Sequence, residues 1–167
     1  GRFLTTEAWY ENPSDPFGRS PSVITYDIEE RRQVTEDNRA WVAGLGDEGG
    51  GGAWLAAIMK QLVRPDPAEL VKMQRFVDEV IWGGLQYAEG DWVYGVRKSM
   101  FYYEPDSMPA GTYGEGVRYG GWSSWKRAEA LSVVRSYNYP HVAALHWTMY
   151  RLARNQTGLI THRTWGW

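Results

Sequence analysis

The stretch GGAWLAAIMKQLVRPDPAELVKMQRFVDEVIW, residues 51–82, decides the fold. Apolar residues from Trp54 to Leu62 recur at helical spacing, which predicts a helix over residues 53–64. Pro65 ends this helix because proline cannot donate a backbone hydrogen bond and is incompatible with a helix interior.

A second helix begins directly afterwards. Asp66 is the expected N-cap, Pro67 occupies the first turn, and Glu69 stands where the second residue of a capping box belongs. Apolar residues from Leu70 to Ile81 give the helix a buried stripe, and glycines after Trp82 end it. The connection between the two helices is so short that we expect an antiparallel helical hairpin.

The rest of the chain is predicted to be mainly helical, with one β insertion. Residues 1–22 are rich in proline and polar residues and form an extended lead-in. Two short runs of aromatic and β-branched residues predict a β-hairpin near 91–103, and residues 104–121 form a long loop. Helical spacing returns over residues 122–136 and 140–154. We therefore treat residues 1–167 as a single segment.

Aromatic residues and glycines dominate the composition. The chain has ten tryptophans, eleven tyrosines and nineteen glycines in 167 residues. Rigid rings offer a large contact area at a low entropic cost, which suits ligands that have apolar faces and polar edges, such as sugars. The same rings also pack well in a core, so each of them has a structural alternative.

Other function classes lack support. The net charge of −2 provides no basic surplus for a nucleic-acid backbone, and there is no cysteine for a disulfide or a thiolate metal site. No apolar run approaches the length of a membrane span, and no phosphate-binding or dinucleotide motif occurs. The three histidines lack the spacing of a helical metal pair, so we expect no metal and no cofactor.

The first residues do not form a signal peptide, and the chain does not begin with methionine. We therefore interpret it as a mature or internal segment of a secreted or extracellular protein.

Three segments resemble a known superfamily. They are WVAGLGDEGGGGAWLAA at 41–57, RSYNYPHV at 135–142 and HWTMYRLAR at 146–154. Together they resemble a group of large bacterial and fungal proteins assigned to the six-hairpin glycosidase-like superfamily. That resemblance implies part of an (α/α) toroid, in which paired helices form a cup that holds a carbohydrate.

A ring of six helical pairs needs twelve helices, whereas this sequence shows about four and an unfinished fifth. The resemblance therefore implies that the remainder of the same polypeptide, or another fragment, completes the toroid.

Asp47 and Glu48, which precede four consecutive glycines, are the first catalytic candidates. A glycosidase needs two carboxyl groups on either side of one bond, and one of them must have a raised pKa. In the alternative reading, these two acids only cap the following helix. The run of glycines favours the catalytic reading because a helix cap does not require it.

Glu115 lies between two glycines in the long loop and is the candidate partner across a cleft, although it could equally be an ordinary exposed acid. We expect Trp41, Tyr113, Trp122 and Tyr139 to form a platform for the sugar.

Arg135, Asn138, Tyr139 and His141 meet at one predicted helix junction. Arginine or asparagine neutralises a uronate carboxylate in a polysaccharide lyase, and tyrosine or histidine supplies its base. In the alternative reading, Asn138 caps the turn and Tyr139 packs against the next helix.

The sequence therefore favours a carbohydrate-active enzyme, with glycoside hydrolysis as its reaction. In that reading Asp47, Glu48, Glu115 and His141 are the catalytic candidates, and Arg135 and Asn138 contact the substrate. A polysaccharide lyase and a non-catalytic carbohydrate-binding or structural protein remain the alternatives.

Overall fold

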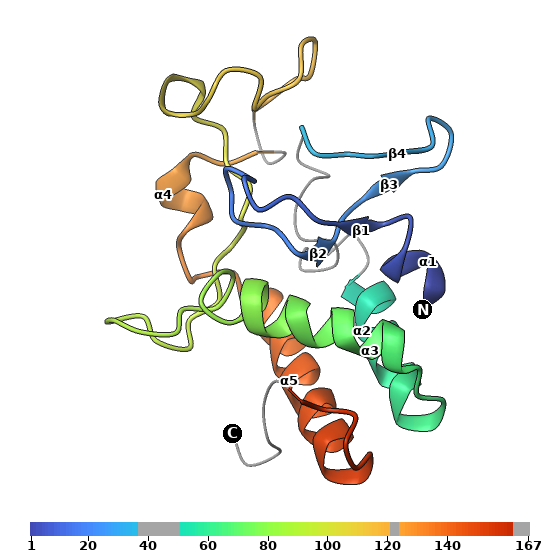
Figure 1. Cartoon of the computed structure of the whole chain (residues 1–167). Coiled ribbons are helices and arrows are strands. Elements are labelled where there is room, and N and C mark those ends of the chain that lie inside the picture. The colour runs from blue at the N-terminus through green and yellow to red at the C-terminus, as the bar shows by residue number, and fades with distance from the viewer. Residues whose placement is uncertain (37–50, 121–123, 162–167) are drawn as a thin grey trace.

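The structure is a computed structural model that describes residues 1–36, 51–120 and 124–161. Figure 1 shows the long helices gathered at one end of the molecule, with the small hairpins and long loops at the other. In chain order the elements are α1 (Arg2–Thr5), β1 (Trp9–Tyr10), β2 (Ser22–Val23), β3 (Tyr26–Asp27), β4 (Arg32–Gln33), α2 (Gly51–Val63), α3 (Pro67–Arg75), its π-helical continuation (Phe76–Ile81), a 3₁₀ turn (Pro105–Ser107), α4 (Arg127–Ala130) and α5 (Asn138–Asn155).

The helical pair α2 and α3 is confirmed. The Asp66 carboxylate accepts hydrogen bonds from the backbone N–H groups of Ala68 and Glu69, at 3.0 and 3.3 Å, as an N-cap should.

The capping box is completed from α2. The Oε1 atom of Gln61 accepts the backbone N–H of Asp66 at 2.7 Å, and its Nε2 atom donates to the Glu69 carboxylate at 2.8 Å. Lys60 donates to the same carboxylate at 2.9 Å. The completely buried Gln61 side chain therefore joins the two helices at their connection.

The main core lies where α2, α3 and α5 pack together. Trp54 of α2 is fully buried, and its ring meets that of Phe76 edge-on, with 5.7 Å between the centroids. Other fully or almost fully buried residues in this core are Ile58, Leu70, Met73, Val77, Val80, Ile81, Val142, Leu145, Met149 and Leu152. Helix α5 confirms the helix predicted over residues 140–154.

The predicted (α/α) toroid is wrong. The described residues contain five α-helices, and two of these, α1 and α4, have only four residues each. The helix predicted over residues 122–136 is reduced to α4 in the described part of that range.

The physical reason is that the aromatic residues of the loops pack on one another in a second, non-helical core. Its members are Tyr10, Phe17, Ile24, Phe101, Tyr102 and Ala130. The expectation that the remainder of the polypeptide, or another fragment, completes the toroid rested on that fold alone.

The β-hairpin predicted near 91–103 is also wrong. Tyr94 has a φ of 68°, which ends the first extended run, and residues 94–97 turn back onto 85–87. Tyr87 donates its backbone N–H to Gly95, and Arg97 donates to Leu85, both at 2.9 Å. The next residues pair elsewhere, because the backbone N–H groups of Lys98 and Ser99 bond to Ser132 and Ala130.

The strands that do form belong to the N-terminal part. Strand β1 pairs antiparallel with β2, and β3 pairs antiparallel with β4. Residues 1–22, for which the sequence predicts an extended lead-in, thus contain α1, β1 and β2, and Trp9 is buried in the main core. In the described part of the chain, no helix combines the length and apolar character needed to cross a membrane.

The Gln61 contacts give a test of the fold. Gln61→Ala removes the hydrogen bonds to Glu69 and to the Asp66 backbone in a buried place, so we expect a loss of about 1–3 kcal/mol in the free energy of unfolding. Urea denaturation measures this loss. The control is Arg64→Ala, an exposed position three residues further on, which should change stability by less than about 0.5 kcal/mol. Equal effects of the two substitutions would contradict this role of Gln61.

Candidate functional site

The loop between β1 and β2, residues 11–21, forms one wall of the candidate site. The Asn12 side chain accepts the backbone N–H of Ser14 at 3.1 Å, and the Asn12 backbone N–H donates to the Ser20 hydroxyl at 2.7 Å. These bonds hold the two ends of the loop together and replace the hydrogen bonds of a regular element. Residues 11–21 thus form a loop without a regular element.

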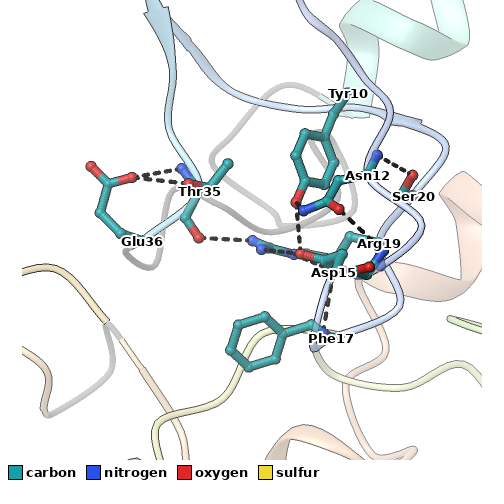
Figure 2. Close-up of polar contacts among 9 residues, drawn as sticks. Tyr10, Asn12, Asp15, Phe17, Arg19, Ser20, Thr35 and Glu36 are labelled. Atoms are coloured by element: carbon teal, nitrogen blue, oxygen red, sulfur yellow. Dashed lines mark hydrogen bonds and ion pairs between the residues drawn. The ribbon is translucent and has the colours of Figure 1, made fainter. Parts of the chain in front are cut away.

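A buried ion pair between Asp15 and Arg19 lies at the centre of this loop. The two side chains are only 1% and 2% exposed, and the Nη2 atom of Arg19 lies 2.6 Å from Oδ1 of Asp15. The Nε atom of Arg19 donates to both carboxylate oxygens, at 3.3 and 3.1 Å. Figure 2 shows the pair between the Tyr10 ring and the backbone of Thr35, whose carbonyl accepts from Nη1 at 3.2 Å.

The Asp15 carboxylate also accepts hydrogen bonds outside this pair. The Tyr10 hydroxyl donates to it at 2.9 Å, and the backbone N–H groups of Phe17 and Arg19 donate at 3.2 and 2.8 Å. Burial by itself raises the pKa of Asp15, but the hydrogen bonds and the charge of Arg19 outweigh it and hold the pKa below its ordinary value. Asp15 is thus ionised at neutral pH, and both of its carboxylate oxygens accept hydrogen bonds from within the protein.

A hollow of about 260 Å³ opens beside the ion pair. Among the described residues of its wall, Asp15 and Arg19 alone are charged, and each neutralises the other. The remaining lining consists of neutral polar and apolar residues: Tyr10, Asn12, Ser14, Pro16, Phe17, Thr35, Pro109, Ala110, Gly111 and Thr112. The hollow therefore presents hydrogen-bonding groups and apolar surface without a net charge.

The opposite wall of the hollow, residues 109–112, is the tip of the long loop 104–120. Gly111 has a φ of +81°, a left-handed conformation that favours glycine. The loop is fixed just beyond this tip by Tyr113, whose hydroxyl accepts the backbone N–H of Glu104 at 2.9 Å and donates to the Tyr102 carbonyl at 2.7 Å. Burial raises the pKa of Tyr113, so its hydroxyl keeps the proton that it donates.

Tyr119 fixes the other end of the loop. Its ring stacks on that of Tyr103, with 4.4 Å between the centroids and 6° between the planes. Its hydroxyl accepts the backbone N–H of Gly114 at 2.8 Å and donates to the Glu36 carbonyl. The wall is thereby positioned before any ligand arrives.

The predicted site residues are only partly brought together. Trp41, Asp47, Glu48 and Trp122 lie outside the described residues. Glu115 is exposed in a turn three residues beyond Thr112, and so lies close along the chain to the wall of the hollow.

Tyr113, predicted as a sugar platform, packs among the aromatic rings of Phe17, Phe101, Tyr103 and Tyr119. Its contacts make it a support of the hollow wall, and it is not among the lining residues.

Arg135 and the first turn of α5 form a separate group. Asn138 is fully buried and donates from Nδ2 to the carbonyls of Arg97 and Lys98, at 2.8 and 3.0 Å. The Tyr139 hydroxyl donates to the Val133 carbonyl at 2.8 Å, while Nδ1 of His141 is buried without a hydrogen-bond partner. In Figure 1 the loop 105–120 lies at the end of the molecule opposite to α5, and Glu115 and His141 belong to these two different segments.

Sequence reasoning missed Asp15 and Arg19. The residues Asp15-Pro16-Phe17-Gly18-Arg19 predict a turn, and nothing in the pattern indicates that the two charges meet in a buried place. Their spacing of four residues was the one available signal. Among the residues that the structure describes, no group of three acidic or histidine side chains is arranged to hold a metal ion.

Comparison with known proteins identifies a family. Residues 1–167 match DUF5695, a family of unknown function, and the chain therefore belongs to that family. No curated protein and no solved structure matches the chain.

The ion pair predicts a pH-dependent contribution to stability. Because the folded-state pKa of Asp15 is lowered, its contribution is complete above the ordinary aspartate value of about 4 and is lost as the pH falls through the folded-state value. Asp15→Asn leaves Arg19 buried without its anion, so we expect a loss of about 3–5 kcal/mol at neutral pH and a weaker dependence of stability on acid. Urea denaturation at neutral and acidic pH measures both.

The exposed Asp106→Asn is the matched control and should leave the neutral-pH stability within about 0.5 kcal/mol of the parent. An Asp15→Asn variant as stable as this control would contradict the role given to the pair.

Proposed function

We propose that this member of the DUF5695 family binds a neutral carbohydrate unit in the hollow beside Asp15 and Arg19. The observation that carries the proposal is a wall of neutral hydrogen-bonding and apolar residues around a single, internally neutralised ion pair. A sugar ring has hydroxyl groups at its edge and C–H groups on its faces, and it matches such a wall. A charged ligand would lose its hydration without gaining a counter-charge.

The size of the hollow supports a small ligand. Pockets for drug-sized molecules occupy about 300–1,000 Å³, and this hollow is smaller, at about 260 Å³. One sugar unit, either free or at the end of a chain, is the corresponding ligand. The hydroxyls of Ser14, Thr35 and Thr112 supply polar contacts, and Pro16 and Pro109 supply apolar ones.

Binding is better supported than catalysis within the described residues. Asp15 is the only carboxylate in the wall, and its lowered pKa and full set of hydrogen bonds make it unsuitable as a general acid. A glycosidase also needs a second carboxyl group near the first.

Glycoside hydrolysis is the second candidate function, and Glu115 favours it. In the described part of the chain, no hydrogen bond or ion pair engages this exposed carboxylate, which follows the hollow wall closely in sequence. Asp47 or Glu48 would supply the second carboxyl group.

The lyase alternative, in which Tyr139 or His141 acts as the base, is not favoured, because the Tyr139 hydroxyl already donates a hydrogen bond to the Val133 carbonyl. A secreted or extracellular location stays a prediction.

Filling the hollow tests the binding proposal. Ala110 is exposed and lies in the wall, so Ala110→Trp should block the ligand without disturbing the core. We expect affinity for a neutral oligosaccharide, found by screening gluco-, manno-, galacto- and xylo-oligomers, to fall at least about tenfold in isothermal titration calorimetry.

Ala143→Trp is the matched control because this exposed residue lies on α5, away from the wall. The proposal fails if no neutral oligosaccharide binds, or if both tryptophan variants bind as well as the parent chain.

Glu115→Gln tests hydrolysis. If Glu115 transfers a proton, the variant should lose about 100-fold or more in turnover of the oligosaccharide that binds, with its affinity unchanged. Glu89→Gln, another exposed acid in a loop, is the control and should keep full turnover. Reducing-end release measures the rate, and equal rates in the two variants would remove Glu115 from the reaction.

A further inference from the structure

A second polar surface lies where residues 97–98 cross residues 125–135. The backbone N–H groups of Lys98 and Ser99 bond to Ser132 and Ala130, at 2.9 and 3.0 Å, and hold the two segments together. Figure 1 shows α4 and the preceding loop 86–98 on the same side of the molecule. Five cationic residues belong to this surface: Arg97, Lys98, Lys126, Arg127 and Arg135.

Aromatic rings hold four of these cations in place. Nζ of Lys98 and Cζ of Arg135 lie 4.2 and 5.4 Å from the centroid of the Trp125 ring. The guanidinium groups of Arg97 and Arg127 lie over Tyr87 and Tyr102, at 4.4 and 5.6 Å. A guanidinium group held against a ring is pre-organised, and its N–H groups can bind a carboxylate or sulfate in a bidentate manner.

Positive charge is only partly balanced on this surface. Lys98 forms an ion pair with Glu129. In the part of the chain that the structure describes, the side chains of Arg97, Lys126 and Arg127 form no ion pair. Glu104 is also near, because its carboxylate accepts the backbone N–H of Arg127 at 3.0 Å. Among the described residues, Arg97, Lys126 and Arg127 thus leave a local surplus of positive charge after Lys98 pairs with Glu129, although the whole chain carries −2.

Buried polar atoms provide an independent observation at the same place. Nε of Arg97, Oδ1 of Asn138 and Nδ1 of His141 are buried without a hydrogen-bond partner. Asn138 itself is 0% exposed, and its Nδ2 atom bonds to the carbonyls of Arg97 and Lys98. Buried polar atoms are usually satisfied, so these three atoms are exceptions beneath the surface.

The start of α5 adds to the positive potential. This helix of 18 residues has no acidic residue in its first turn and no side chain that caps it. Its N-terminal end therefore contributes an uncompensated partial positive charge, which attracts anions.

We infer that this surface binds the carboxylate or sulfate groups of an acidic carbohydrate. The carbohydrate part of the inference rests on the proposed function, whereas the anionic part rests on the cations that the aromatic rings hold in place. The oxyanion pairs with the guanidinium groups that the aromatic rings hold in place. The hollow and this surface are then two separate binding sites.

Calorimetric titration of the whole chain tests the inference. The probes are a galacturonic acid oligomer, the same oligomer as its neutral methyl ester, a sulfated oligosaccharide, inorganic sulfate and a single-stranded DNA oligomer. We expect an acidic oligosaccharide to bind at least about tenfold more tightly than the methyl ester, and its affinity to fall as salt is added. The carboxylated and sulfated probes distinguish the two sources of the oxyanion.

Two substitutions locate the binding. Arg127→Gln, at an exposed position, and Arg135→Gln should each weaken binding of the acidic oligosaccharide about tenfold. Arg151→Gln is the matched control because this exposed arginine lies further along α5, and it should bind like the parent chain. The Ala110→Trp variant should keep its affinity for the acidic probe. Failure of the binding proposal for the hollow can therefore be told apart from failure of the inference for this surface.

Three outcomes would overturn the inference. The first is equal affinity for the galacturonic acid oligomer, the sulfated oligosaccharide and the methyl ester. The second is unchanged binding in both Arg127→Gln and Arg135→Gln. The third is that inorganic sulfate or DNA binds as tightly as the acidic oligosaccharide. This result would show that the surface binds anions in general and does not recognise a carbohydrate.

Discussion

The buried ion pair of Asp15 and Arg19 is the interaction on which the loop-rich half of the molecule depends. Two charges taken out of water destabilise a fold unless their geometry and hydrogen bonds are nearly complete. Here the bonds come from the loop backbone, from Tyr10 and from the Thr35 carbonyl. The chain around the pair is therefore restricted to conformations in which all of these hydrogen bonds to Asp15 and Arg19 form together.

The ion pair also connects the polar loop to the second core. The Arg19 guanidinium lies over the Phe17 ring at 4.8 Å and near Tyr10 and Phe101, at 5.8 and 5.9 Å. The Arg19 side chain that neutralises Asp15 in the wall of the hollow thus also contacts the rings of the second core. The helical half is stabilised differently, by apolar packing of Trp54 against Phe76 and by the Gln61 contacts between α2 and α3. Loss of the hollow would therefore not require loss of the helical core.

The sequence predicts α2, α3 and α5 because their signals are local. The N-cap at Asp66, the proline after it and the regular apolar spacing all lie within the helices that they specify. The Asp15–Arg19 pair could not be predicted in the same way, since its partners Tyr10 and Thr35 come from other segments.

The β-hairpin near 91–103 failed for a related reason. The runs 92–96 and 99–103 have strand-like composition, but the backbone N–H groups of residues 97–99 bond to Leu85, Ser132 and Ala130. The toroid was implied by the resemblance of three segments, and such a resemblance gives no information about whether the rings elsewhere in the chain pack on helices or on each other. They pack on each other around Phe17 and Phe101.

In loop 104–120, the tyrosines that anchor the loop are different residues from those that line the hollow. Tyr113 and Tyr119 bond to backbone groups of other residues, whereas the tip at 109–112 lines the hollow. Residues at the tip can therefore change without loss of the bonds that position the loop. Substitutions at the tip can therefore change which ligand the hollow prefers, while the rest of the fold stays the same.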